Sequence, residues 1–372
     1  MHCSKLVAML LALCVIFTLA ACENQAPPTS DELDDISVST PSEEEKPKEP
    51  EIIYEVNPLT GEKNLLPEAK GKKPVAVVVN NIRMAQPVQA GLHMADVVFE
   101  TEVEGGITRL LALFSDPTAV PAIGTIRSLR VPFAEIACGM DSILFYHGID
   151  HTYALPLLPS LPMKSFTVDS KTYGYREKNG LPSEHTLYTT GEKIDKAITD
   201  RKFNYESARG NWLNFSAEDK PLVPATYSVG TAKVSFSSTT ETQFIYDAET
   251  GKYNRARKGE VYTDLTTGQK EQFTNVFVLK TSISNYPDGY HRKVDLSSGQ
   301  GYYITAGGAE DILWSKGSAS NNFVFTKADG TQLTVNPGNS YVCLINSSRP
   351  INFEPIITET APEASQPESS AQ

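Results

Sequence analysis

The chain has 372 residues, enough for about two domains. Hydrophobic residues make up 40% of it and charged residues 21%, a composition that allows a buried core and excludes disorder throughout. Its 33 basic and 45 acidic residues give a net charge of −12, which argues against a nucleic-acid partner because phosphates favour a basic surface.

The first segment is typical of an export signal. Lys5 precedes an apolar run over residues 6–20, which suits a signal peptide and is too short to span a bilayer. The run closes with Leu19-Ala20-Ala21-Cys22, which resembles the lipobox of bacterial lipoproteins, whose cysteine thiol receives a diacylglyceryl group. We therefore predict a signal peptide over residues 1–21 and a lipid on Cys22; an ordinary secretory signal cleaved nearby is the alternative.

Two acyl chains, palmitate among them, hold a protein stably on a membrane. The predicted location is accordingly the extracytoplasmic face of the cell membrane. Residues 23–53 contain ten acidic residues and two lysines, and their composition cannot bury enough apolar surface to fold. We predict a disordered acidic tether over residues 22–53 and a disordered tail over residues 354–372. The tether and the tail carry most of the net charge, so the part between them is nearly neutral.

Residues 54–220 alternate strand-like and helix-like segments, which predicts an N-terminal α/β domain with a mixed sheet. The continuous apolar run 74–79 is typical of a strand that is buried on both faces. Further strands are predicted over residues 95–102, 107–115 and 142–148.

Two helices are predicted to cover this sheet. Apolar residues at helical spacing over residues 129–140 predict the first, with Ser128 as its N-cap. A capping box of Thr189 and Glu192, followed by the apolar side chains of Ile194 and Ala197, predicts the second.

Residues 221–353 lack helical patterns and contain short alternating strands separated by glycine-containing turns, which predicts a C-terminal antiparallel all-β domain. The boundary falls in the Pro-containing stretch 219–224. The predicted fold class is therefore α+β, with one domain of each kind. Cys138 and Cys343 lie in apolar surroundings in different domains, so two buried thiols are expected; a disulfide between the domains is the alternative.

Several segments together resemble one known family. They are NPLTG at 57–61, PVAVVVNN at 74–81, GLHMADVVFETEVEGGITRLLALF at 91–114, IGTIRSLR at 123–130, HTLYT at 185–189, YNRARKGEVYTDLTTGQ at 253–269 and NVFVL at 275–279. On these residues the chain resembles the YerB-like bacterial lipoproteins, over nearly everything from residue 57 to about residue 345. The resemblance implies a two-domain extracytoplasmic lipoprotein with no assigned biochemical function.

A dense set of polar residues in apolar company forms the candidate ligand-binding site. Its members are Asp96, Glu102, Glu104, Arg109, Arg127, Ser128 and Arg130. Strand spacing places Glu100, Glu102 and Glu104 on one face, where like charges repel unless cations compensate. The pair Gly105-Gly106 allows a tight turn that brings Arg109 back beside these acids.

Two interpretations of this set stay open. In the first, the charges form a salt-bridge network that holds strand ends together. In the second, Ser128 opens a helix whose free amides, flanked by Arg127 and Arg130, attract phosphate or carboxylate groups of envelope polymers.

The preferred function is a lipid-anchored binding or scaffold protein of the cell envelope, with a wall polymer or an envelope protein as partner. The alternative is an envelope enzyme that uses the same residues, either a glycan hydrolase with Glu102 paired to Glu104 or Asp96, or a phosphoryl transferase. No catalytic residue is assigned.

No cofactor or metal ion is predicted, because the sequence contains none of the usual zinc-protease, hydrolase-elbow, P-loop or dinucleotide motifs. His147, Asp150 and His151 follow an apolar strand and are interpreted as a loop rather than as a metal or base site. Basic residues of the second domain form either a solvated strand face or a docking face for acidic polymer. They are Arg255, Arg257, Lys258, Arg292 and Lys293.

Overall fold

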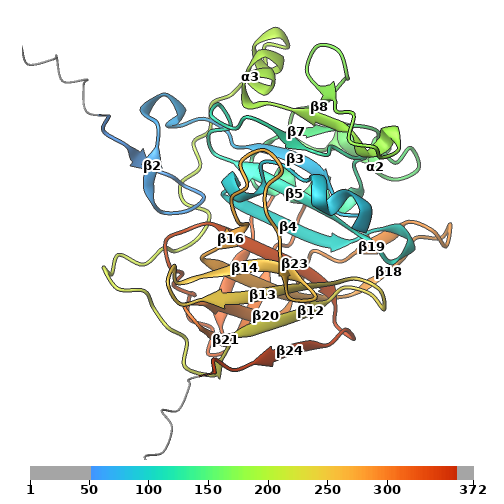
Figure 1. Ribbon diagram of the computed structural model, residues 1–372. Helices are drawn as coiled ribbons and strands as arrows, with labels where there is room; N and C mark the ends of the chain where they lie inside the picture. Colours follow the sequence, from blue (N-terminus) through green and yellow to red (C-terminus); the bar gives the residue numbers. More distant parts are fainter. Residues whose placement is uncertain (1–51, 358–372) are drawn as a thin grey trace, which may run out of the picture. The chain divides into compact units, whose positions relative to one another are not determined.

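The computed structural model describes residues 52–357 (Figure 1). The predicted signal peptide and Cys22 lie outside these residues, as do most of the predicted tether and tail. Among the described residues, no helix has the length and apolar character needed to cross a membrane.

The largest sheet has eleven strands and draws on both predicted domains. The N-terminal part supplies β3 (Val75–Asn80), β4 (Val97–Glu102), β5 (Thr108–Phe114), β7 (Ile143–Tyr146) and β8 (Ser165–Thr167). The C-terminal part supplies β11 (Tyr227–Ser228), β17 (Asn275–Thr281), β20 (Ser298–Thr305), β21 (Gly308–Ser315), β22 (Val324–Lys327) and β23 (Ser340–Asn346). The order across the sheet is β11-β21-β20-β17-β23-β4-β5-β3-β7-β8, and β22 pairs with β21.

The two parts meet where β23 pairs in parallel with β4. Val342 of β23 lies opposite Phe99 of β4, and β23 also runs parallel to β17 on its other side. This junction was not among the predictions. It joins a mixed α/β part and a mainly antiparallel part into one continuous sheet, so the described residues form one compact unit.

A second, six-stranded antiparallel sheet packs on the C-terminal part of the large sheet. Its strands are β12 (Thr231–Ser235), β13 (Glu241–Asp247), β14 (Lys252–Arg257), β15 (Glu260–Val261), β16 (Gln272–Phe273) and β24 (Ile351–Glu354). The rings of Phe244 and Phe273 each lie 5.0 Å from that of Tyr341, so aromatic contacts fill the space between the two sheets.

Three smaller pairings complete the strands. They are β1 (Glu55–Val56) with β2 (Lys63–Leu65), β10 (Leu187–Thr189) with β6 (Ile123–Gly124) and β9 (Tyr175–Arg176), and β18 (Ile283–Asn285) with β19 (Arg292–Val294).

Three α-helices lie in the N-terminal part: α1 (Val131–Gly139), α2 (Ala154–Leu157) and α3 (Gly191–Asp200). Residues 201–357 contain none. The cap predicted for α3 is wrong by one residue. The Thr190 hydroxyl accepts the amide of Lys193 at 3.1 Å, whereas Thr189 belongs to β10 and donates to the carbonyl of Tyr173.

Alternating residues of the large sheet enter two different cores, which confirms the prediction that its strands are buried on both faces. Val77 of β3 packs in the core that contains Ile194 of α3, and Val78 packs in the core that contains Phe133 of α1. Cys138 and Cys343 are both buried and free, and they also lie in these two different cores, so the sheet separates them.

A buried polar network ties the second sheet to the N-terminal part. Arg255 of β14 is fully buried and pairs with Glu271 at 2.7 Å. Its guanidinium also donates to Asn81 Oδ1 at 2.7 Å and to Gln89 Oε1 at 3.1 Å. Arg255 is therefore not part of a solvated strand face, because its charge is satisfied inside the protein.

Replacing Arg255 with methionine is expected to reduce the free energy of unfolding by about 3–5 kcal/mol, because Glu271 is left buried without its cation. Urea denaturation of the full chain measures this. The control is Arg257→Met, two residues along the same strand and half-buried, which should cost less than about 1 kcal/mol. A double variant with Glu271→Leu should recover part of the loss. Equal effects of the two single variants would contradict the role given to Arg255.

Candidate functional site

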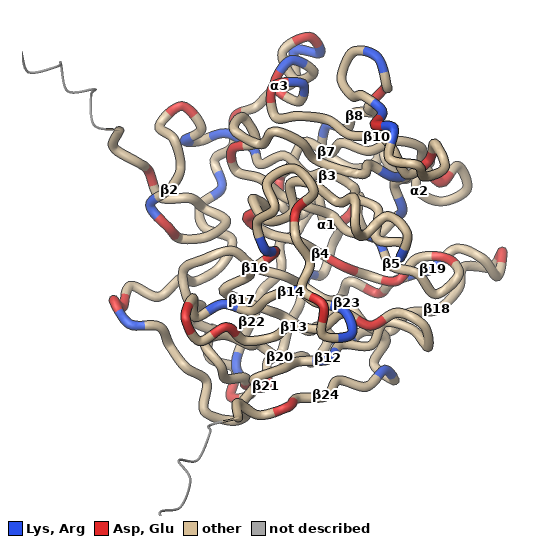
Figure 2. Tube along the Cα trace, viewed as in Figure 1, with Lys and Arg blue, Asp and Glu red and all other residues tan. Residues whose placement is uncertain are grey.

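Three arginines from two segments gather where β3 and β7 end; we call Arg109, Arg127 and Arg130 the arginine cluster. Arg109 is on β5 opposite Asn80, the last residue of β3. The amide of Arg127 donates to the carbonyl of Val78, and its own carbonyl accepts from His147 just beyond β7. Figure 2 shows both signs of charge around the ends of β4, β5 and β19, close to this cluster.

The turn predicted at Gly105-Gly106 exists and places Arg109. Both glycines have positive φ, +69° and +72°, which residues with a Cβ rarely adopt. The chain returns from β4 into β5 with Glu102 opposite Thr108 and Thr101 opposite Arg109. The predicted turn is present and returns Arg109 to the end of β4, but among the described residues it does not bring Arg109 within ion-pair distance of the acids, contrary to the prediction from the sequence.

Ser128 does not cap a helix. The segment before α1 is extended and pairs with its neighbours, since the amide of Leu129 donates to the carbonyl of Gly148 and Leu129 lies opposite Ile149. The helix therefore begins only at Val131, with Arg130 at the N-cap position and no side-chain cap. The predicted anion site on amides opened by Ser128 is accordingly not formed. What Ser128 provides is its carbonyl, which accepts from Arg109 at 2.7 Å.

Arg109 is the least compensated charge of the cluster. Its side chain is 3% exposed, no carboxylate among the described residues lies within ion-pair distance, and its Nε has no hydrogen-bond partner. Burial and the neighbouring charge of Arg130 together lower the pKa of Arg109 to about 9, although Glu104 acts in the opposite direction. The cluster therefore concentrates positive charge around a buried guanidinium.

Arg127 and Arg130 are half-buried and face two different environments. Arg127 donates to the backbone carbonyl of Glu184 at 3.0 Å, and its Nε has no partner. Burial lowers the pKa of Arg127, with a smaller contribution from Arg130. Arg130 pairs with Glu104 and is the one member of the cluster that has a carboxylate within ion-pair distance in the described structure.

Only one of the predicted acids contacts the cluster in the described structure. Glu104 pairs with Arg130, whereas Glu102 pairs at 3.1 Å with Arg292, a residue of β19 in the C-terminal part. Glu100 is fully buried and accepts hydrogen bonds from the side chains of Asn81, Thr108, Thr242 and Tyr341. The salt-bridge interpretation therefore describes Glu102 and Glu104, and among the described residues it leaves Arg109 and Arg127 without a carboxylate partner.

Asp96 lies at the other end of β4, about 20 Å from Glu102 along six residues of strand. It accepts hydrogen bonds from Asn57 Nδ2 at 2.9 Å and from the amide of Ser115 at 2.6 Å. Asp96 thus fastens the loop at residue 57 to the sheet. Asp96 therefore does not lie at the predicted ligand site, because it and Glu102 are at opposite ends of the same strand.

Sequence reasoning missed two polar residues next to the cluster. Asn80 donates a hydrogen bond to His185 Nδ1 over 2.8 Å, and burial, together with Arg127, lowers the pKa of His185. His185 is therefore neutral near pH 7, so its Nδ1 can accept. The signal that could have found Asn80 is its place immediately after a buried apolar strand, where site residues are common.

The carboxylate of Asp150 is held by hydrogen bonds within the protein. It accepts the amides of Thr152, Tyr153 and Ala154 and lies 3.2 Å from Nε2 of His291. In residues 52–357 no group of three or more His, Cys, Asp or Glu side chains is arranged to hold a metal ion.

Two family models match this chain. The N-terminal domain of a protein family of unknown function (DUF3048) matches residues 59–204, and the C-terminal domain of the same family matches residues 232–342. A curated relative from Bacillus subtilis, named "Putative lipoprotein YerB", is 29% identical over 291 residues, which are 77% of this chain and 85% of that protein. The chain belongs to the YerB-like family.

A solved structure supports the family fold. The crystal structure of YerB protein from Bacillus subtilis matches with a TM-score of 0.67 and 28% identity, covering 80% of this chain and 99% of that one. The comparison confirms the predicted α+β fold of this chain, with a mixed sheet in the N-terminal part and mainly antiparallel strands in the C-terminal part. The gap between the two family models includes the predicted boundary at residues 219–224.

The pH dependence of stability tests the structural role of Asp96. Burial raises its pKa from 3.8 to about 6, although Ser115 and Asn57 act in the opposite direction. Between these two values the folded state holds a proton that the unfolded state has released, so this group's contribution to stability falls as the pH rises. Relative to Asp96→Asn, the wild type should lose about 2 kcal/mol between about pH 4 and about pH 7.

Urea denaturation at both pH values measures this difference. The control is Asp329→Asn, because hydrogen bonds from Thr331 lower the pKa of the Asp329 carboxylate and its contribution should rise with pH instead. A wild-type stability that does not fall relative to Asp96→Asn would show that Asp96 is not a buried, proton-binding clamp.

Proposed function

We propose that this chain is a lipid-anchored protein of the bacterial cell envelope that binds an anionic group at the arginine cluster. The observation that carries the proposal is Arg109, a nearly fully buried guanidinium with two further arginines beside it and, within residues 52–357, no carboxylate at ion-pair distance. The ligand class is a phosphate or carboxylate group of an envelope polymer or of a partner protein.

The charge balance of the cluster supports this ligand class. In the described structure the cluster has three guanidinium groups and one ion-paired carboxylate, that of Glu104. Burying a charge without a counter-ion costs several kcal/mol, and an oxyanion bound by Arg127 and Arg130 would offset part of that cost. Arginine suits this task because its planar group donates two parallel hydrogen bonds to carboxylate or phosphate.

The anchoring rests on the sequence and on the relative's name. Cys22 follows a signal-like apolar run, and the curated relative from Bacillus subtilis is named as a lipoprotein. A lipid on Cys22 and the acidic stretch 23–53 would hold the folded part outside the cytoplasm, at the end of a tether repelled by an anionic membrane.

Replacing Cys22 with alanine tests the anchor. The variant should incorporate no radiolabelled palmitate and should leave the membrane fraction, because the two acyl chains provide the membrane affinity. Fractionation and autoradiography of cells that express the full chain measure both effects. Cys343→Ala is the control for thiol loss and should stay with the membrane. Label on the Cys22→Ala chain would refute the assigned lipid site.

Inorganic pyrophosphate is the probe for the arginine cluster. Arg127→Ala should weaken its binding to the full chain about tenfold or more, which corresponds to one charge-assisted hydrogen bond. Titration calorimetry at low salt measures the affinity. Arg83→Ala, an exposed arginine outside the cluster, is the control and should change little.

Thermal unfolding of the same variants separates a binding site from a salt-bridge network. Without pyrophosphate, Arg127→Ala should melt at or above the wild-type temperature because it relieves repulsion within the cluster. Glu104→Gln should melt lower, because it leaves Arg130 unpaired. A destabilised Arg127→Ala whose affinity for pyrophosphate is unchanged would favour the network and overturn the binding proposal.

A further inference from the structure

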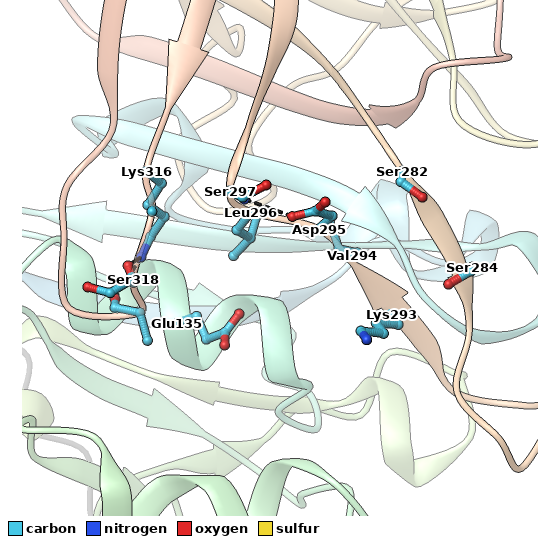
Figure 3. A pocket seen from close by; sticks show the side chains of 12 residues that line it. Glu135, Ser282, Ser284, Lys293, Val294, Asp295, Leu296, Ser297, Lys316 and Ser318 are labelled. Carbon is cyan, nitrogen blue, oxygen red and sulfur yellow. Dashed lines mark hydrogen bonds between the residues drawn. The ribbon is translucent and has the colours of Figure 1, made fainter.

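A second polar cavity lies beside α1 and shares no residue with the arginine cluster. It has a volume of about 450 Å³ and is lined by α1, the β18–β19 hairpin and residues 316–319 (Figure 3). That volume is in the range of small-molecule sites. The β19 strand that borders the cavity also carries Arg292, the partner of Glu102, so one hairpin lies next to both sites.

The wall of this cavity contains two cations and two anions. They are Lys293 and Lys316, and Glu135 and Asp295. In the view of Figure 3, the carboxylate of Glu135 lies between Lys316 and Lys293. Lys293 and Asp295 are exposed, whereas Lys316 is 3% exposed and Glu135 is half-buried. The cavity is thus nearly neutral in total but has separated positive and negative groups.

The two less exposed charges have no ionic partner within the described part of the chain. Lys316 Nζ donates to the carbonyls of Ser318 at 2.9 Å and Ala319 at 2.6 Å, and no carboxylate lies within ion-pair distance of it. Glu135 has no ion pair or side-chain hydrogen bond in that region. Burial lowers the pKa of Lys316 to about 8 and raises the pKa of Glu135, and the two groups partly offset each other's shifts. Perturbed groups that line a cavity are typical of binding sites.

The rest of the lining narrows the ligand class. Of the twelve described lining residues none is aromatic, so the cavity lacks the flat surface on which sugar rings and nucleobases stack. Four are serines, whose hydroxyls both donate and accept hydrogen bonds, as a peptide group requires. Separated charges of both signs suit a molecule that carries an ammonium and a carboxylate group.

We infer that this cavity binds a short zwitterion, a dipeptide with free termini, with its ammonium group on Glu135 and its carboxylate on Lys316. The exposed Lys293 and Asp295 contribute at the edge of the cavity. Binding of this kind is separate from anion binding at the arginine cluster, because the two sites use different residues.

A library of dipeptides with free termini tests the inference on the full chain. Saturation-transfer NMR identifies the strongest binder, and calorimetry then compares it with its N-acetylated and its C-amidated forms. Each cap removes one charge and should weaken binding about tenfold or more. If no free dipeptide binds, or if the doubly capped form binds as well as the free one, the inference is wrong.

Point variants test which end of the dipeptide contacts Glu135 and which contacts Lys316. Glu135→Gln should weaken the free dipeptide and its C-amidated form, and should leave the N-acetylated form unchanged. Lys316→Met should show the reverse pattern, and Lys293→Gln replaces it as the cationic test if Lys316→Met does not fold. The controls are Glu249→Gln and Lys258→Gln, two exposed residues outside the cavity. Equal loss for all three ligand forms in Glu135→Gln would contradict the assigned orientation, and no loss in any variant would refute the site.

Discussion

The buried hydrogen-bond network around Asn81 is the interaction on which the arrangement of this protein depends. The side-chain oxygen of Asn81 accepts a hydrogen bond from Arg255 of the second sheet, and its side-chain nitrogen donates one to Glu100 of β4. Glu100 in turn accepts from Tyr341 of β23, the strand that joins the two parts. A buried arginine and a buried glutamate are each costly alone, so their mutual satisfaction fixes how the second sheet lies on the first.

The same junction brings elements of the C-terminal part to the edge where the arginine cluster lies. The β18–β19 hairpin pairs Arg292 with Glu102 and places His291 3.2 Å from Asp150. One side of this hairpin therefore neutralises an acid near the cluster, and its other residues line the cavity beside α1. The cavity beside α1 depends on contacts between the two parts, because Glu135 comes from the N-terminal part and its other lining residues come from the C-terminal part.

Local patterns predicted four strands of the N-terminal part and two of the helices, and they failed where neighbours compete for the same residues. Serine is a common residue at helix N-caps, yet the chain stays extended at Ser128 because the following residue, Leu129, pairs with the segment after β7. Asp96 is close to Glu102 in sequence and far from it in space, because one strand separates them. Lys316 and Glu135 belong to no sequence motif, because they are distant in sequence and line the same cavity only in the folded chain.

The sequence by itself determined the export-signal pattern, the acidic ends, the alternation of strand and helix in the first half and the family. These properties depend on composition and on short periodic patterns, which each segment carries alone. Only the tertiary structure decided that β23 joins β4, that Arg109 is buried with no counter-ion in the part of the chain that the structure describes, and that a charged cavity forms beside α1. The physical reason is that ion pairing, burial and strand order depend on contacts between residues distant in the chain, and a pattern read along the chain does not contain them.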